Sequence, residues 1–322
     1  MLHKVAAAAV SLLVGAGLLA APAAARALTD GAPTSAPRTL VGPPVADAAR
    51  CGSEPSDAAG WTTLFGGLSG GWAGGDGAAS LRLPDGRVLW LFGDTFTGSV
   101  TADGRRGSDA RIVRNSVVVT DGLCATVATP GRDALPGRDG TWLWPTQAVL
   151  VSAGAAGSDT VLRVFAQRVR RTGGGAFGFA RTGTAVVTLT VPWDGVPRTG
   201  AVADLPAGDV LWGAALVPEG ATTWVYGTRE VHEDLVFGRD LMLARAPTAT
   251  VSDPRTWTYR TATGWSRDPA AARPVRPGRD GVSTVPSVSK VGGSYVVVTK
   301  AQEFLDPVVV ELRSATPWGP WT

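Results

Sequence analysis

A β-rich unit occurs four times along the chain, and this repeat constrains the fold more than any other feature. Asp76, Asp139, Asp209 and Asp280 each open one unit, at spacings of 63, 70 and 71 residues. Each unit continues with a strand-like run, a turn signal and a second strand-like run, and no stretch shows convincing helical periodicity. Such repeats are typical of β-propeller blades. The sequence therefore predicts an all-β propeller with blades that start near residues 72, 139, 209 and 280.

The first unit contains the clearest hairpin, GGDGAASLRLPDGRVLWLFGDT, at residues 74–95. Its two apolar runs flank the turn signal Pro84-Asp85-Gly86, and Asp76 and Asp94 are equally distant from Asp85. These two residues should face each other, with Cβ atoms about 4.5–5.5 Å apart, or about 7–8 Å on a diagonal. Glycosidases hold their paired acids at comparable separations. Mutual repulsion should raise one pKa and leave an acid beside a base near neutral pH.

A simpler role is also open to both residues, because an Asp next to a glycine commonly forms a turn. An Asp opens every unit, so Asp76 fits a turn-forming role as well as a catalytic one. Asp94 differs, since the matching positions in the later units are Gln167, Thr228 and Lys300. The repeat does not require a carboxylate there, which favours a functional role for Asp94.

The N-terminus has the pattern of a secretory signal peptide, with Lys4, an uncharged apolar run to Ala21 and a cleavage-like site that ends at Ala27. We expect residues 1–27 to be removed, residues 28–50 to form a Pro- and Ala-rich disordered leader, and residues 51–322 to form the propeller. No other stretch is apolar enough for a membrane helix, so a secreted, extracellular protein is expected. Cys51 and Cys124 are the only cysteines, and in an exported chain they most simply form a disulfide.

Charge and motifs argue against several classes of function. The formal net charge is +3, and loss of residues 1–27 lowers it to +1. Neither a basic patch nor a nucleic-acid motif is present, so nucleic-acid binding is not expected. The remaining histidine, His232, rules out a multi-histidine zinc site. We expect no cofactor and a monomer, with calcium on clustered carboxylates as an alternative that no ligand loop of known spacing supports.

Twelve tryptophans, against three tyrosines, suggest stacking on sugar rings, although most should serve packing. Trp72, Trp142, Trp144 and Trp212 lie where first strands begin, and there we expect ligand contact. Other polar residues complete the candidate substrate-binding set: Arg114, Asn115, Gln147, Arg229, Glu230 and Asp280. The alternative for these residues is that they are simply solvated strand ends.

Several runs together resemble a family of secreted actinobacterial five-bladed propellers related to endo-D-arabinanases: GWAGGDGAASLRLPDGRVLWLFGDTF, VRNSVVV, WLWPTQAVL, GVSTVPSVSK and SATPWGPWT. The resemblance extends from about Gly60 to Thr322, and the GGDG and GDT pair is its most specific part. It implies hydrolysis of a cell-wall polysaccharide such as a D-arabinan, with Asp76 and Asp94 as the catalytic pair. The family continues past the GPW motif, so a missing C-terminal blade and a gap between the fourth and first blades are expected.

Three classes of function remain open after this comparison. In the enzymatic version, Asp94 is the nucleophile or base and Asp76 is the acid. The main alternative is a non-catalytic carbohydrate-binding propeller, followed by a protein-interaction scaffold. The first two share a polysaccharide or oligosaccharide ligand and differ in whether a glycosidic bond breaks.

Overall fold

Antiparallel sheets follow one another along the chain in the computed structural model, which describes residues 51–66, 68, 71–101, 103–153, 157–175, 177–303 and 306–322. The all-β prediction is therefore confirmed. The described residues belong to one compact unit. The expected signal peptide and leader, residues 1–50, lie outside the described residues.

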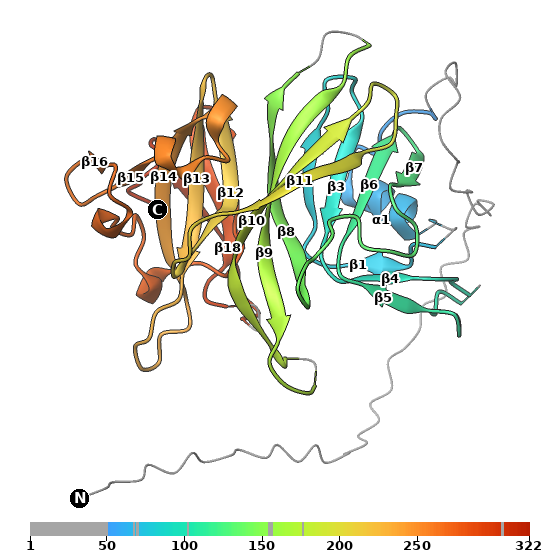
Figure 1. Ribbon diagram of the computed structural model, residues 1–322, viewed down its shortest axis with the longest axis horizontal. Helices are drawn as coiled ribbons and strands as arrows, with labels where there is room; N and C mark the ends of the chain where they lie inside the picture. The colour runs from blue at the N-terminus through green and yellow to red at the C-terminus, as the bar shows by residue number, and fades with distance from the viewer. Residues whose placement is uncertain are drawn as a thin grey trace, which may run out of the picture. The chain divides into compact units, whose positions relative to one another are not determined.

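Four sheets each take their strands in chain order, with two strands of a smaller sheet inserted between the second and third strands of the first (Figure 1). The first contains β2 (Ala79–Arg82), β3 (Val88–Phe92), β6 (Ser116–Asp121) and β7 (Cys124–Val127). The second contains β8 (Thr141–Ser152), β9 (Thr160–Arg171), β10 (Phe179–Val191) and β11 (Arg198–Asp204). The third contains β12 (Val210–Glu219), β13 (Thr222–Arg229), β14 (Asp240–Pro247), β15 (Thr258–Arg260) and β16 (Trp265–Ser266). The fourth contains β17 (Ser287–Val291), β18 (Ser294–Lys300) and β19 (Val309–Ser314).

The remaining elements are short. A small sheet joins β1 (Gly74–Gly75), β4 (Thr95–Thr97) and β5 (Arg111–Val113). The helices are α1 (Ala58–Gly66) and the 3-10 turns η1 (Thr248–Thr250), η2 (Pro254–Thr256), η3 (Pro269–Ala271) and η4 (Gly278–Asp280). Of the helices in the described part of the chain, none has the length and apolar character needed to cross a bilayer.

The first strands of the four sheets lie next to one another around a cavity. Strand β8 contacts both β2 and β12, and β12 also contacts β17. Residues from all four strands, or directly before them, line a cavity of about 450 Å³. First strands that surround a common axis are the arrangement of propeller blades.

Apolar side chains fill the spaces between successive sheets. Leu89 and Leu91 of the first sheet pack with Leu143 and Leu162 of the second. Equivalent clusters join the second sheet to the third and the third to the fourth. Because one face of each sheet is buried against its neighbour, the alternation of side chains along the strands fixes the register.

Helix α1 was not predicted, and it covers the face of the first sheet that is turned away from the second. Its Trp61 and Phe65 lie against Trp90, with ring centroids 4.9 and 5.1 Å away. The disulfide between Cys51 and Cys124 ties the segment before this helix to β7, with the Cα atoms 5.4 Å apart. The structure thus contains the expected disulfide.

The turn of the first hairpin is locked to the second sheet by a buried arginine. The Arg87 guanidinium contacts Asp85 at 2.6 Å, and these side chains are only 8% and 5% exposed. Arg87 also donates to the carbonyl oxygens of Pro192 and Gly195 at 2.8 and 2.7 Å. A buried ion pair with such hydrogen bonds is costly to break, so it holds the hairpin in place.

The fourth sheet differs from the others in two ways. Only three of its strands are found among the described residues, and Val291 and Val298 are exposed on one of its faces. Asp280 does not open its first strand directly, because it ends η4, seven residues before Ser287. The 3-10 turn η4 and a short loop therefore separate Asp280 from the first strand of this sheet.

Candidate active site

Asp76 and Asp94 lie opposite each other at the open end of the first hairpin. The pairs Ala79 with Leu91 and Gly75 with Thr95, which lie on either side of the aspartates, have the same offset, and this offset places Asp76 opposite Asp94. The Asp76 N–H donates to the Asp94 carbonyl oxygen at 3.1 Å, and the Gly93 N–H donates to the Asp76 carbonyl oxygen at 2.8 Å. The hairpin therefore brings the two aspartates together.

A glycine makes room for the Asp76 carboxylate. A Cβ atom added at Gly93 would lie 2.5 Å from Asp76 Oδ1, far inside van der Waals contact. The left-handed residue next to Asp76 is Gly77, with φ 61°. At the equivalent turn of the second sheet Asp139 itself is left-handed, with φ 52°. Asp139 thus forms its turn directly, whereas glycine takes that role beside Asp76.

Two donors hold the Asp94 carboxylate. Trp144 Nε1 donates to Oδ1 at 2.9 Å, and the Arg114 guanidinium lies 3.5 Å from Oδ2. Arg114 lies between β5 and β6, two residues before the third strand of the first sheet, and Trp144 comes from β8 of the second sheet. Both contacts orient the carboxylate and complement its negative charge.

Burial raises the pKa of Asp76 above its usual value, and the nearby charge of Asp94 raises it further. The backbone N–H groups of Asp94 and of Asp76 itself oppose this shift more weakly. Like charges in one site favour retention of a proton by one partner. Of the two carboxyls, Asp76 is therefore the one suited to carry a proton.

An aromatic cluster borders Asp94. Trp144 packs edge-on against Trp142 and Phe179, at centroid distances of 5.8 and 4.7 Å. The Arg114 guanidinium lies 4.8 Å from the Trp142 ring. The buried Nε1 of Trp142 has no hydrogen-bond partner among the described residues.

The axial cavity begins beside this pair. Gly77, the neighbour of Asp76, lines it together with Gln147 of β8 and Val285 before β17. Gln147 also accepts a hydrogen bond from the Ala148 N–H at 3.0 Å, which fixes its side chain. Of the predicted binding residues, Gln147 is thus placed in the cavity wall.

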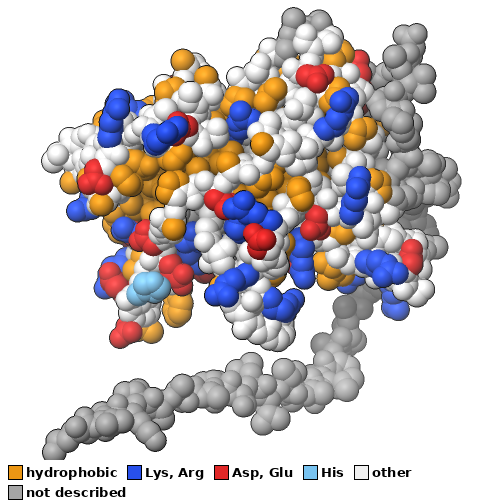
Figure 2. All heavy atoms as spheres, viewed as in Figure 1, with side chains coloured by type: hydrophobic (Ala, Val, Ile, Leu, Met, Phe, Trp, Pro, Cys, Tyr) orange, Lys and Arg blue, Asp and Glu red, His pale blue; other side chains and the backbone are white. Residues whose placement is uncertain are grey.

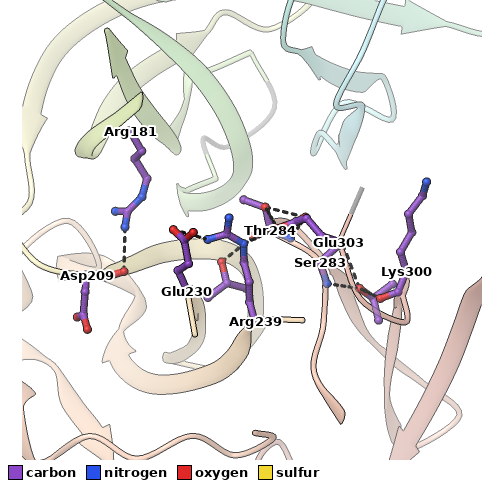
Figure 3. A network of polar contacts seen from close by, with 10 residues as sticks. Arg181, Asp209, Glu230, Arg239, Ser283, Thr284, Lys300 and Glu303 are labelled. Atoms are coloured by element: carbon purple, nitrogen blue, oxygen red, sulfur yellow. Dashed lines mark hydrogen bonds and ion pairs between the residues drawn. The ribbon is translucent and has the colours of Figure 1, made fainter. Parts of the chain in front are cut away.

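Across the second, third and fourth sheets, a polar network occupies the strand ends (Figure 3). Arg181 donates to the Asp209 carbonyl oxygen at 2.8 Å. Burial and the nearby Arg239 lower the pKa of Arg181. Arg239 lies 3.8 Å from Glu230 and 2.5 Å from Glu303, which also accepts from the Thr284 hydroxyl. Glu230 is 62% exposed and points toward Arg239 (Figure 3).

The other predicted residues are placed less favourably. Trp72 is 6% exposed and packs on Phe65 and Phe92, so it is a core residue and cannot stack on a sugar. Asn115 is fully buried and holds the backbone of Leu135 and Leu143, which is a structural role. These two predictions failed because a strand-end position does not fix the direction of the side chain.

Three further predicted residues lie away from the Asp pair. Trp212 packs between Trp257 and Tyr259 in the core that joins the second and third sheets. Arg229 pairs with Asp240 at 2.7 Å, and Asp280 is an exposed residue of η4. None of these three residues is joined to Asp76 or Asp94 by a contact that the described structure shows.

The sequence reading missed Phe179, Arg239 and Glu303. Phe179 opens the third strand of the second unit, and its position at the same sheet end as Trp144 was the available signal. Arg239 and Glu303 lie in loops whose path the repeat pattern does not determine. No group of three or more His, Cys, Asp or Glu side chains suited to a metal ion occurs within the described ranges.

A family model matches residues 60–322, and that family is described as a domain of unknown function, DUF5005. The chain belongs to the DUF5005 family. The match spans the same region as the propeller resemblance noted in the sequence. No curated protein matches this DUF5005 protein significantly.

Solved structures provide a comparison of the fold. A candidate hydrolase from Bacteroides ovatus is similar over 82% of the DUF5005 chain and 72% of its own, at 18% identity and a TM-score of 0.61. An arabinanase from Bacillus subtilis matches over 78% and 77%, at 13% identity and a TM-score of 0.39. An α-L-arabinofuranosidase from Clostridium thermocellum matches over 77% and 71%, at 11% identity and a TM-score of 0.41. The first shows a shared fold alone, and the other two scores are too low to establish one.

Proposed function

We propose that this DUF5005 protein is a secreted glycoside hydrolase that acts on a cell-wall polysaccharide, with a D-arabinan as the first candidate. The observation that carries the proposal is the opposition of Asp76 and Asp94, combined with the raised pKa of Asp76. A protonated carboxyl next to an ionised one is the requirement of glycosidic bond hydrolysis. The resemblance of the GGDG and GDT motifs to arabinanase-related propellers favours the arabinan.

In this mechanism Asp76 is the general acid. Its proton passes to the glycosidic oxygen as the bond to the anomeric carbon breaks, which such catalysis accelerates by about 10²–10⁴-fold. Asp94 attacks the anomeric carbon or removes a proton from the attacking water. Its contacts with Trp144 and Arg114 aim the carboxylate during this step.

The aromatic cluster supports a sugar ligand at this position. Trp144 and Phe179 present apolar surface beside Asp94. We assign the four sheets as propeller blades. The cavity that Gly77 lines then extends from the Asp pair toward the propeller axis. Glu230, exposed across the mouth, is a candidate to bind a more distant sugar unit.

The second candidate is a non-catalytic carbohydrate-binding propeller, which the same aromatic cluster favours. One assay distinguishes the two functions. Residues 28–322 are incubated with arabinans, galactans and xylans, and released oligosaccharides are measured beside equilibrium binding. Release of products from one polysaccharide supports the hydrolase, whereas tight binding without any product supports the binding protein.

A further inference from the structure

A cluster of tryptophan and arginine side chains lies on the outer part of the third sheet. Trp224 of β13 is opposite Arg245 of β14, and Arg260 of β15 is opposite Trp265 of β16. Trp318, from the segment after β19, completes the cluster, with its ring centroid 6.1 Å from that of Trp224 and 6.0 Å from that of Trp265. On the side of the molecule that holds β14, β15, β16 and the C-terminus, Figure 2 shows hydrophobic side chains next to basic ones. We call these five residues the tryptophan–arginine patch.

The patch is separate from the candidate active site. Asp240 opens β14 next to Arg239 of the polar network, and Arg245 lies five residues further on, which corresponds to about 17 Å along a strand. Strand β16, which carries Trp265, has no counterpart among the described strands of the first and second sheets. The propeller repeat therefore does not require the strand on which this patch is built.

Both arginines of the patch are held against aromatic rings. The Arg245 guanidinium carbon lies 4.5 Å from the centroid of the Trp265 ring. The Arg260 guanidinium carbon lies 5.4 Å from the centroid of the Trp318 ring, and Trp318 is 36% exposed. Both guanidiniums donate to nearby neutral oxygens at 2.9 Å, and neither forms an ion pair with a described carboxylate. A guanidinium stacked on an indole keeps its other N–H groups in a fixed fork, which is the geometry that binds carboxylate and phosphate groups.

Positive charge is in excess around the patch. Residues 241–275, all of them described, contain five arginines, two aspartates and neither lysine nor glutamate, which is a surplus of three positive charges. Of the two aspartates, Asp253 takes part in an ion pair and Asp268 caps η3. The neighbouring Glu219 and Glu311 are each paired with a basic side chain, so they do not offset this surplus. A negatively charged ligand therefore complements the patch.

We infer that the tryptophan–arginine patch is a second carbohydrate-binding site, for a polysaccharide that carries carboxylate or phosphate groups. The exposed indole of Trp318 offers an apolar surface to the C–H groups of a sugar ring and an N–H to a hydroxyl group. Arg245 and Arg260 supply the donors for an anionic substituent. A neutral glycan would make no use of these two charges.

This site would assist the active site without taking part in the chemistry. A long polysaccharide held at the outer part of the third sheet keeps its other segments near the Asp pair, which raises their effective concentration there. The inference rests on the proposed function for the kind of polymer that is bound. The binding itself requires no hydrolysis, so the two proposals can fail separately.

Binding to immobilised polysaccharides tests the inference, with residues 28–322 carrying Asp76→Asn so that the ligand is not consumed. The probes are polygalacturonate, which carries carboxylates, a phosphomannan, which carries phosphates, and a neutral galactan. We expect tighter binding to at least one acidic probe than to the galactan, and the preferred acidic probe identifies the anionic group. The double variant Arg245→Gln, Arg260→Gln should weaken that binding by at least about tenfold, because hydrogen bonds between charged groups are lost. Trp318→Ala should weaken it as well.

The matched control is the double variant Arg132→Gln, Arg198→Gln. It removes the same charge from two exposed arginines that lie outside the third sheet. We expect this control to bind both acidic probes as the parent does. Thermal melting followed by circular dichroism separates a loss of binding from a loss of the fold in every variant.

Three results would overturn the inference. The first is that the parent binds neither acidic probe, or binds the galactan as tightly as both of them. The second is an equal loss of affinity in the patch and control double variants. The third is tighter, patch-dependent binding of a single-stranded oligonucleotide, which would make the patch a nucleic-acid site. Absence of hydrolysis by the unsubstituted protein would count against the proposed function alone.

Discussion

The main-chain N–H of Asp76 donates to the carbonyl oxygen of Asp94 at 3.1 Å, so the two aspartates occupy adjacent points of one hairpin. They cannot move apart unless the hairpin unpairs. That hairpin is fixed at its other end by the buried Arg87 and Asp85 pair. The fold thus holds two carboxyls together in a rigid frame, which is the condition for a shifted pKa and for a reproducible geometry of attack.

Gly93→Ala tests whether the position of the Asp76 carboxylate matters. The added Cβ would lie 2.5 Å from Asp76 Oδ1, so the flexible carboxylate must move aside while the backbone stays in place. We expect a loss of hydrolysis of at least tenfold with little change in melting temperature. Gly183→Ala is the matched control, because no atom lies within 4 Å of its added Cβ. Equal activity of the two variants would contradict a role for this carboxylate.

Asp76→Asn tests the cost of ionising Asp76 in the folded protein. Because the folded pKa lies above the unfolded value of 3.8, the ionised folded state is penalised at neutral pH, and the penalty vanishes when both states are protonated. The variant should therefore be more stable than the parent at pH 7 and no more stable below pH 3.8. Urea unfolding at several pH values measures this difference. A variant that is less stable at pH 7 would refute the raised pKa.

Trp144→Phe removes one donor to Asp94 and keeps an aromatic ring against Phe179. Hydrogen bonds to charged groups contribute about 1.5–3 kcal/mol, which corresponds to roughly 10–150-fold in rate if the bond acts in the transition state. We expect this loss in kcat, with a smaller change in KM. A change confined to KM would show that Trp144 serves binding alone.

Replacement of both Cys51 and Cys124 by serine tests the covalent link to helix α1. A loop closed across a sequence separation of 73 should stabilise the fold by about 4 kcal/mol in the chain-entropy model. The unfolding midpoint in urea should fall accordingly, whereas the cleavage of a soluble oligosaccharide should persist below that midpoint. Unchanged stability would show that the packing of Trp61 and Phe65 suffices to hold this segment.

The sequence allowed the first hairpin and its register to be predicted, because Pro84-Asp85-Gly86 defines the turn and the flanking alternation defines the faces. It did not reveal α1. Its stretch AAGWTTLFG has two threonines, two glycines and no clear periodicity, and its stability comes from contacts of Trp61 and Phe65 with Trp90. Tertiary packing of this kind overrides local propensity.

The candidate site was also predicted only in part, because it too depends on tertiary packing. Repeat positions locate the end of a strand, and this suffices to predict that Asp76, Asp94, Arg114 and Trp144 lie near one another. They do not give the side-chain direction, so Trp72, which donates to the Ser116 hydroxyl at 3.2 Å in the core, was placed wrongly. The partners across sheets, such as Phe179 on Trp144, depend on the approach of two sheets that no local pattern encodes.

The central claim is tested most directly by steady-state hydrolysis of the preferred polysaccharide by Asp76→Asn and Asp94→Asn, with binding measured in parallel. Asp139→Asn is the control, because asparagine tolerates the left-handed backbone of that turn. We predict a fall in kcat of about 10²–10⁴-fold for each site variant, with the affinity for the polysaccharide retained and the control fully active. Full activity of either site variant would contradict the assignment of this pair as the catalytic acid and its partner.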